Sequence, residues 1–191
     1  MEFRDIPCHS SDKKMGQRND RGPETLAGSS LKTTKTQDFA LPIGECRDQF
    51  GALCWRMHRG RVEVLLVTSR DTGRWVIPKG WPGKGLDAPS SAAREAWEEA
   101  GVEGEIGQEP LGLYTYAKRR VPDAPLPCAV TVFPLRVARL ADRFPERRER
   151  QRKWFRAEKA ARKVVEVELR EILTRLDADP SLVTKGYDQS A

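Results

Sequence analysis

The chain has 191 residues, of which 38% are hydrophobic and 32% charged, and its formal net charge is +6. This length and balance suit one domain of ordinary size with an additional unstructured part. No apolar run approaches the ~20 residues of a membrane helix, and the N-terminus lacks the apolar segment of a signal peptide.

The N-terminal segment, residues 1–44, is rich in Ser, Thr, Lys, Asp and Gly and shows no sustained hydrophobic period. Such a segment has too little apolar surface to offset the conformational entropy that it loses on ordering. We therefore predict a disordered tail over residues 1–44, a folded domain over 45–179 and a flexible C-terminal end over 180–191.

The first half of the folded domain is expected to consist of strands followed by a helix. Aliphatic and β-branched runs predict strands over residues 50–57, 62–69 and 74–78. Residues 79–86 contain three glycines and a proline, which indicates a loop. The helix after this loop is expected to end at Gly101. Its candidate N-caps are Asp87, Ser90 and Ser91.

The second half is expected to repeat this order. Two further strands, 110–118 and 128–139, flank the Pro-rich loop 121–127. A last helix is predicted over 158–176, because Ala161, Val165, Leu169, Ile172 and Leu176 recur at helical spacing. The order of strands, helix, strands and helix predicts an α/β layered domain with a mixed sheet.

Three glutamates lie close together in the first helix, within the segment REAWEEAGV. Residues three and four apart are neighbours on a helix, so Glu95, Glu98 and Glu99 share one face. Like charges at this spacing destabilise a helix by roughly a few tenths of a kcal/mol per pair. Clustered carboxylates suit hard cations such as Mg²⁺ or Mn²⁺. The alternative is a solvated acidic surface in which Arg94 is a local ion-pair partner.

The segment 80–102, GWPGKGLDAPSSAAREAWEEAGV, resembles the Nudix box, G-x5-E-x7-R-E-U-x-E-E-x-G-U, in which U is apolar. The residues in register are Gly80, Arg94, Glu95, Ala96, Glu98, Glu99, Gly101 and Val102. One position departs, because Leu86 stands where the box has its first glutamate, beside Asp87. The resemblance implies an α/β/α sandwich with a mixed sheet and metal-assisted hydrolysis of a diphosphate linkage.

The resemblance also implies roles for the matching residues. Glu98 and Glu99 are expected to be metal ligands, and Glu95 either a ligand or the general base that activates water. The backbone carbonyl of Gly80 is expected to complete the metal shell. Arg94 is expected to orient a catalytic glutamate through a charge-assisted hydrogen bond. The implied cofactor is Mg²⁺ or Mn²⁺.

The basic segment 141–163 holds ten Lys/Arg against four Asp/Glu, which equals the whole net charge of the chain. Such a cluster favours an anionic partner, unless it is a solvated helix end. Within it, Glu146 and Glu149 are candidates for the acidic ligand that many Nudix proteins add from outside the box. Trp154 and Phe155 are expected to pack the last helix onto the sheet.

Segments 63–81 and 150–164, taken with the box, resemble the diphosphoinositol polyphosphate phosphohydrolase branch of the family. The animal members carry three glycines where this chain has Lys79-Gly80-Trp81. The branch implies a small-molecule polyphosphate substrate, either diphosphoinositol polyphosphate or diadenosine polyphosphate. Arg clamps phosphate bidentately, whereas Lys acts as a point charge. The candidate substrate-binding residues are Ser69, Arg70, Lys79, Arg119, Arg120, Arg150, Arg152 and Lys153.

Two alternatives stay open at this point. The first is an ADP-ribose or nucleotide-sugar pyrophosphatase, which needs an adenine slot; Trp81 either stacks on a base or shields the loop. The second is a degenerate Nudix module that binds RNA or a phosphorylated ligand, and Leu86 is its sole support.

The four cysteines, at positions 8, 46, 54 and 128, show neither disulfide-scaffold nor zinc spacing. Cys54 and Cys128 lie in apolar runs and are expected to be small core residues. We expect a cytoplasmic protein with no membrane partner and no nucleic-acid partner. The sequence predicts no particular oligomeric state.

Overall fold

The computed structural model describes residues 46–119, 124–185 and 187. The expected tail, 1–44, and the candidate phosphate ligand Arg120 lie outside these residues. The elements are, in chain order, β1 (Arg47–His58), β2 (Arg61–Thr68), β3 (Trp75–Val76), β4 (Lys79–Gly80), α1 (Ala88–Ala100), β5 (Val102–Ile106), β6 (Gly112–Lys118), β7 (Leu126–Leu140), β8 (Arg152–Arg156), α2 (Ala157–Ala161), α3 (Val167–Ala178) and α4 (Ser181–Thr184).

The strands form one eight-stranded sheet, and the prediction that the sheet is mixed is confirmed. Its central order is β3-β2-β1-β7-β5, and β4 pairs with β1, β6 with β7 and β8 with β2. The long strands β1 and β7 run parallel, from Arg47 beside Cys128 to Trp55 beside Arg136. The other strand pairs of the described residues are antiparallel.

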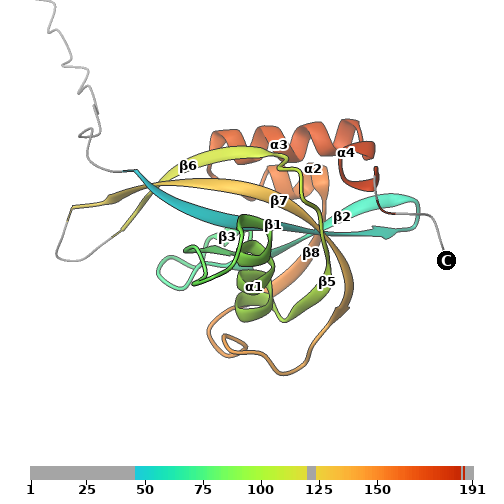
Figure 1. Ribbon diagram of the computed structural model, residues 1–191. Coiled ribbons are helices and arrows are strands. Elements are labelled where there is room, and N and C mark those ends of the chain that lie inside the picture. Colours follow the sequence, from blue (N-terminus) through green and yellow to red (C-terminus); the bar gives the residue numbers. More distant parts are fainter. Residues whose placement is uncertain (1–45, 120–123, 186, 188–191) are drawn as a thin grey trace, which may run out of the picture. The chain divides into compact units, whose positions relative to one another are not determined.

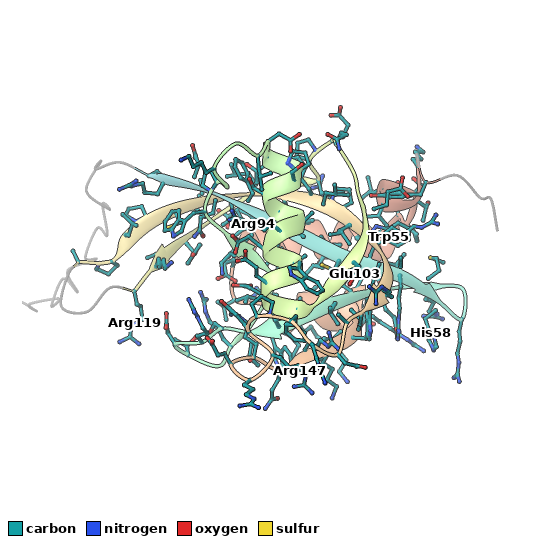
Figure 2. All side chains as sticks on the ribbon, turned by 60° about the horizontal axis from the view of Figure 1, so that its bottom comes forward. Trp55, His58, Arg94, Glu103, Arg119 and Arg147 are labelled. Atoms are coloured by element: carbon teal, nitrogen blue, oxygen red, sulfur yellow. The ribbon has the colours of Figure 1, made fainter. Side chains whose placement is uncertain are left out.

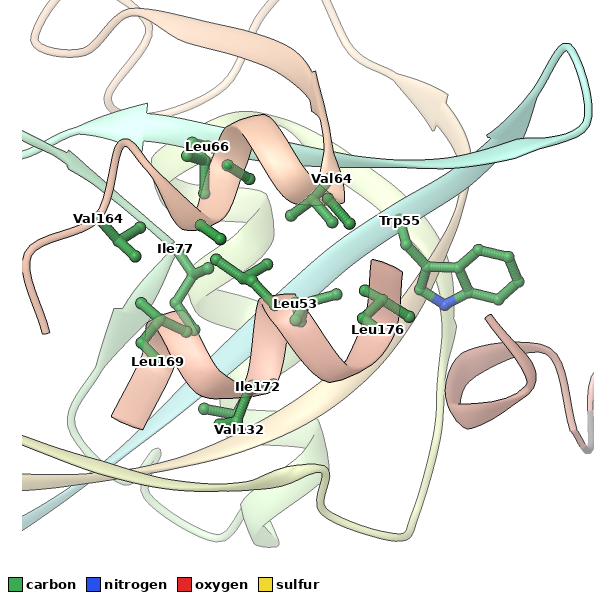
Figure 3. Close-up of a cluster of buried hydrophobic side chains, with 14 of the residues drawn as sticks. Leu53, Trp55, Val64, Leu66, Ile77, Val132, Val164, Leu169, Ile172 and Leu176 are labelled. Atoms are coloured by element: carbon green, nitrogen blue, oxygen red, sulfur yellow. The ribbon is translucent and has the colours of Figure 1, made fainter. Parts of the chain in front are cut away.

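Helices cover both faces of the sheet, which confirms the expected α/β/α sandwich. Figure 1 shows α1 on one side of the sheet and α2 and α3 on the other. On the α1 side, Ala92, Ala96 and Ala100 pack against sheet residues such as Leu65 and Phe133. On the other side, α3 contributes large aliphatic side chains that meet the sheet in a continuous core (Figure 3).

Helix α1 begins and ends where its capping residues predict. The Asp87 carboxylate accepts a hydrogen bond from the Ser90 amide at 2.8 Å, and Gly101 closes the helix in the left-handed conformation with φ 63°. The Ser91 hydroxyl accepts from the Gly83 amide at 3.0 Å and donates to the Asp87 carbonyl at 2.8 Å. This hydroxyl therefore fixes the loop before the helix to the first helical turn.

Several expected elements need correction. Strands β5 and β8 were not predicted, because both are short and rich in charged residues, and Lys79–Gly80 is a short strand instead of loop. The predicted helix 158–176 is two helices, α2 and α3, which are separated at residues 162–166. The break leaves Val165 on the surface, 54% exposed, whereas Leu169 is fully buried.

The predicted packing roles are confirmed for some residues. Phe155 joins the core under α3, while Trp154, its neighbour on β8, packs on the opposite face of the sheet. Cys54 and Cys128 are buried. Val183 of α4 is also buried. No helix in the part of the chain described here is long and apolar enough to cross a membrane.

Candidate active site

A cleft of about 560 Å³ lies beside the glutamate face of α1. Its lining comes from α1, from β4, from the loop after β2, from the end of β6 and from the loop 141–151 between β7 and β8. The three box glutamates, Glu95, Glu98 and Glu99, all line it. This cleft is the candidate active site, because it brings the glutamates of α1 together with polar and basic side chains from separate parts of the chain.

The glutamates differ in burial. The side chains of Glu95 and Glu99, one turn apart, are 11% and 7% exposed, whereas that of Glu98 is 41% exposed. Arg94 donates from Nη2 to Glu95 Oε1 at 2.6 Å and to the Trp81 carbonyl at 3.1 Å. Arg94 therefore joins the helix to the loop after β4 and holds the Glu95 carboxylate, in line with its expected orienting role.

Gly80 lies directly against the Glu95 carboxylate. Strand β4 pairs with β1, with Gly80 opposite Phe50, and this pairing fixes the Gly80 backbone. A Cβ on residue 80 would lie 2.1 Å from Glu95 Oε2 and 2.5 Å from Oε1. Only glycine therefore leaves room for the carboxylate at this position.

Arg150 makes a buried bridge between α1, β2 and the loop 141–151. It donates from Nη2 to Glu99 Oε1, from Nε to Glu146 Oε2 at 2.5 Å and from Nη1 to the Thr68 carbonyl at 2.9 Å. The Glu146 amide also donates to the Glu98 carbonyl at 3.0 Å. The loop 141–151 is thus fastened to the C-terminal half of α1, and Glu146 lines the cleft.

Burial perturbs two titratable groups beside this bridge. The pKa of Glu99 is raised to about 7, because loss of hydration outweighs the attraction of Arg150 and Lys79. The pKa of Lys79 is lowered, first by burial and then by Arg150. The Lys79 amide donates to Glu99 Oε2 at 3.2 Å, and its ammonium lies 5.0 Å from the centre of the Tyr116 ring.

The donor chemistry of the cleft fits a hard divalent cation. Five carboxylates line it, and the Glu95 oxygens lie directly against the backbone of Gly80. Within residues 46–119, 124–185 and 187, however, no three acidic, His or Cys side chains converge closely enough to hold an ion. Arg94 pairs with Glu95 and Arg150 pairs with Glu99, so guanidinium groups supply the counter-charge of these two carboxylates.

Most of the predicted site residues meet in this cleft. Those that line it are Ser69, Arg70, Lys79, Gly80, Arg94, Glu95, Glu98, Glu99, Arg119 and Arg150. Figure 2 shows Arg94 on α1 and Arg119 at the end of β6. Of the two acidic candidates outside the box, Glu146 lines the cleft and Glu149 does not, and both pair with Arg70, at 3.4 and 3.3 Å.

Two predicted phosphate ligands do not line the cleft. Arg152 donates from Nη1 to the Ala100 carbonyl at 2.6 Å and lies over the Phe144 ring. A cation at the C-terminal end of a helix is favourable, so Arg152 stabilises the end of α1. Lys153 is exposed on β8, with its ammonium 5.9 Å from the centre of the Phe155 ring. Neither residue belongs to the candidate site.

Sequence reasoning missed several lining residues, notably Gln49, Arg74, Tyr116 and Lys118. The signal for two of them was strand alternation, because Tyr116 and Lys118 share a face of β6 with the buried Tyr114. Arg74 carried no such signal. It pairs with Glu166, just before α3, at 2.8 Å, and the fold alone brings these two residues together.

The sequence profile of the NUDIX domain matches residues 47–176, more than half of the chain. Arabidopsis thaliana Nudix hydrolase 12, mitochondrial, is 35% identical over 103 residues, covering 52% of this chain and 51% of that protein. Mus musculus diphosphoinositol polyphosphate phosphohydrolase 3-alpha is 32% identical over 110 residues, covering 56% and 63% respectively. The chain therefore spans less than two thirds of the length of either relative.

Solved structures with the same fold include the Ap4A hydrolase of C. elegans. It matches with a TM-score of 0.52 and 21% identity, covering 70% of this chain and 98% of that chain. The NUDIX domain of Shewanella oneidensis NrtR, complexed with ADP ribose, matches with a TM-score of 0.51 and 16% identity, covering 69% and 88%. At these identities the likeness shows a shared fold.

Proposed function

This chain belongs to the NUDIX family, and from that membership we propose that it hydrolyses a diphosphate linkage in a highly phosphorylated small molecule. Nudix hydrolases generally need divalent metal ions. The observation that carries the proposal is the cleft itself, because it gathers all three box glutamates together with Arg70, Lys79 and Arg119. Carboxylates suit a cation and the basic residues suit phosphates, so one cleft offers both kinds of partner.

The box residues have different roles in the proposed reaction. Glu98 and Glu99 would hold Mg²⁺ or Mn²⁺, with the Gly80 carbonyl and Glu146 as further oxygen ligands. When bound, such an ion lowers the pKa of water and neutralises charge on phosphoryl oxygens. Glu95 accepts a proton from the attacking water, and Arg94 keeps its carboxylate in place. The water oxygen bonds to phosphorus as the bridging P–O bond breaks, which gives two phosphate products.

The positions of the basic residues support a polyphosphate substrate. Arg119 lies at the end of β6 and Arg70 in the loop after β2, and both line the cleft. Arg70 is 56% exposed, so its guanidinium is accessible to a ligand, while Lys79 lies deeper. Cations on several sides of the diphosphate site favour a molecule with further phosphates, either a diphosphoinositol or a diadenosine polyphosphate.

A nucleotide-linked diphosphate such as ADP-ribose is the second candidate, and Trp81 favours it. This ring lines the cleft, is 38% exposed and has the Lys118 ammonium 4.8 Å from its centre. An exposed aromatic face beside the glutamates suits stacking on a base. Hydrolysis rates for diphosphoinositol polyphosphate, diadenosine polyphosphate and ADP-ribose, each with Mg²⁺ and with Mn²⁺, will rank the candidates. No hydrolysis of any of them would favour a binding module.

Glu99→Gln tests the site itself. The substitution keeps the shape of the side chain and removes its charge, so we expect metal-dependent phosphate release to fall by at least about 10²-fold. Circular dichroism should show an unchanged fold. Phosphate release at the wild-type rate in this variant would contradict the assignment of the cleft as the active site.

A further inference from the structure

Arg150 differs from the other cations of the cleft in its burial. Its side chain is 7% exposed, against 56% for Arg70. Its three nitrogens each donate to a protein oxygen, of Glu99, Glu146 and Thr68. These bonds engage three of the five N–H donors of the guanidinium, so Arg150 is held by the protein although the residue lines the cleft.

The same guanidinium sits between two carboxylates that need a counter-charge. Glu99 keeps 7% of its side chain exposed and Glu146 keeps 19%, and each raises the electrostatic energy of the other. Two anions that lie so close in a poorly hydrated place require a cation between them. In this arrangement Arg150 is that cation.

We propose that a divalent cation binds to Glu99 only in exchange for Arg150, which is the counter-charge that pairs with this glutamate in the structure. The proposal rests on the proposed function, in which Glu99 is a metal ligand. Arg150 already occupies Glu99 Oε1, and two positive groups repel each other when they share a single carboxylate oxygen. Release from Glu99 frees the engaged Nη2 N–H of Arg150 within the cleft, where the guanidinium can bind a substrate phosphate.

The exchange predicts that Arg150 weakens metal binding. When part of the protein is held in an incompetent state, the apparent dissociation constant rises by the reciprocal of the competent fraction. Removal of the arginine should therefore tighten the binding of Mn²⁺. A residue that only braces the fold would leave this affinity unchanged or weaken it.

The test is a titration of the full chain with Mn²⁺ alone, followed by the electron paramagnetic resonance signal of the free ion. We expect Arg150→Met to lower the Kd by about tenfold. The matched control is Arg147→Met, which removes the same charge from an exposed position in the same loop (Figure 2) and should change the Kd by less than about twofold. A Kd that is unchanged or higher in Arg150→Met would overturn the proposal.

Thermal unfolding gives a second readout if Arg150→Met folds poorly. Without a cation, Glu99 and Glu146 lose their partner, so Tm should fall in EDTA, and saturating Mn²⁺ should recover at least about half of the loss. Equal losses of Tm with and without Mn²⁺ would contradict the exchange. Arg150→Lys, which keeps the charge but lacks the planar fork, should give a Kd between those of wild type and Arg150→Met. A Kd for Arg150→Lys at or above the wild-type value would also contradict it.

Failure of this inference differs from failure of the proposed function. If wild type hydrolyses its substrate and Arg150→Met binds Mn²⁺ no more tightly, the exchange is wrong and the function stands. If Arg150→Met binds Mn²⁺ more tightly and wild type hydrolyses no diphosphate, the exchange stands and the function is wrong.

Discussion

The helices α1 and α3 lie on opposite faces of one sheet, yet they meet it with different side chains. Helix α1 packs through alanines, Ala92, Ala96 and Ala100, and buries the acidic Glu95 and Glu99 beside them. Helix α3 packs through large aliphatic residues, which are Leu169, Ile172, Leu173 and Leu176.

This difference in side chains indicates that the two helices have different roles, one in stability and one at the cleft. A buried Leu or Ile contributes about 1.5–3 kcal/mol to folding, whereas an alanine buries far less apolar area. Buried carboxylates cost free energy unless they are paired, and in α1 both have arginine partners. We infer that α3 stabilises the domain, and that α1 depends on it while placing charged groups at the cleft.

Leu173→Ala tests whether packing of α3 stabilises the domain. Leu173 is fully buried against the sheet, so its truncation leaves a cavity and should lower the free energy of unfolding by about 2–5 kcal/mol. Urea denaturation will measure the change. Because α3 lies on the face opposite the glutamates, kcat well below the midpoint should change by less than about twofold. A large loss of kcat in the folded variant would show that the two faces are coupled.

Gly80→Ala tests whether the position of the Glu95 carboxylate on α1 limits catalysis. The added Cβ would lie 2.1–2.5 Å from the Glu95 carboxylate, so that group must move. A displacement of about 1 Å at a reacting group can cost about 10²-fold in rate, and we expect a loss of kcat of that size.

Gly60→Ala, in the turn between β1 and β2, is the matched control for this substitution. A Cβ there meets nothing within 4 Å, the residue does not line the cleft, and the φ of +72° should lower stability without affecting kcat. Equal kcat values for the two variants would show that the contact between Gly80 and Glu95 does not limit catalysis.

The same comparison shows what could be predicted from the sequence. The bounds of α1 and its acidic face follow from local chemistry, namely the Asp87 cap, the Gly101 terminus and helical spacing. The break between α2 and α3 was missed because Val165 fits the helical period although it is exposed. Burial depends on packing, which periodicity does not report.

The role of Arg150 could not be predicted from the local sequence, because it also depends on packing. Its partners Thr68 and Glu99 lie 82 and 51 residues away in the chain. The pairing of β8 with β2 brings Arg150 close to Thr68. This strand was not predicted because its sequence is rich in charged residues. The sequence therefore identified Arg150 as a cation near phosphates but not as the partner of a box glutamate.

Leu86, the departure from the box, should have the smallest effect. It is 43% exposed, and the loop around it is held by other groups, because the Ser91 hydroxyl bonds both the Gly83 amide and the Asp87 carbonyl. Leu86→Glu, which restores the box, should therefore change the free energy of unfolding by no more than about 0.5 kcal/mol. It should change kcat/KM by less than about threefold.

Ser91→Ala is the companion variant, because it leaves the buried Gly83 amide without its acceptor and should cost about 1–3 kcal/mol. Urea denaturation and steady-state kinetics on both variants separate two explanations of the departure. If Ser91 holds the loop, only Ser91→Ala loses stability, and the glutamate is dispensable in this chain. A gain in kcat/KM of tenfold or more in Leu86→Glu would instead show that Leu86 impairs the site and that the glutamate is not dispensable.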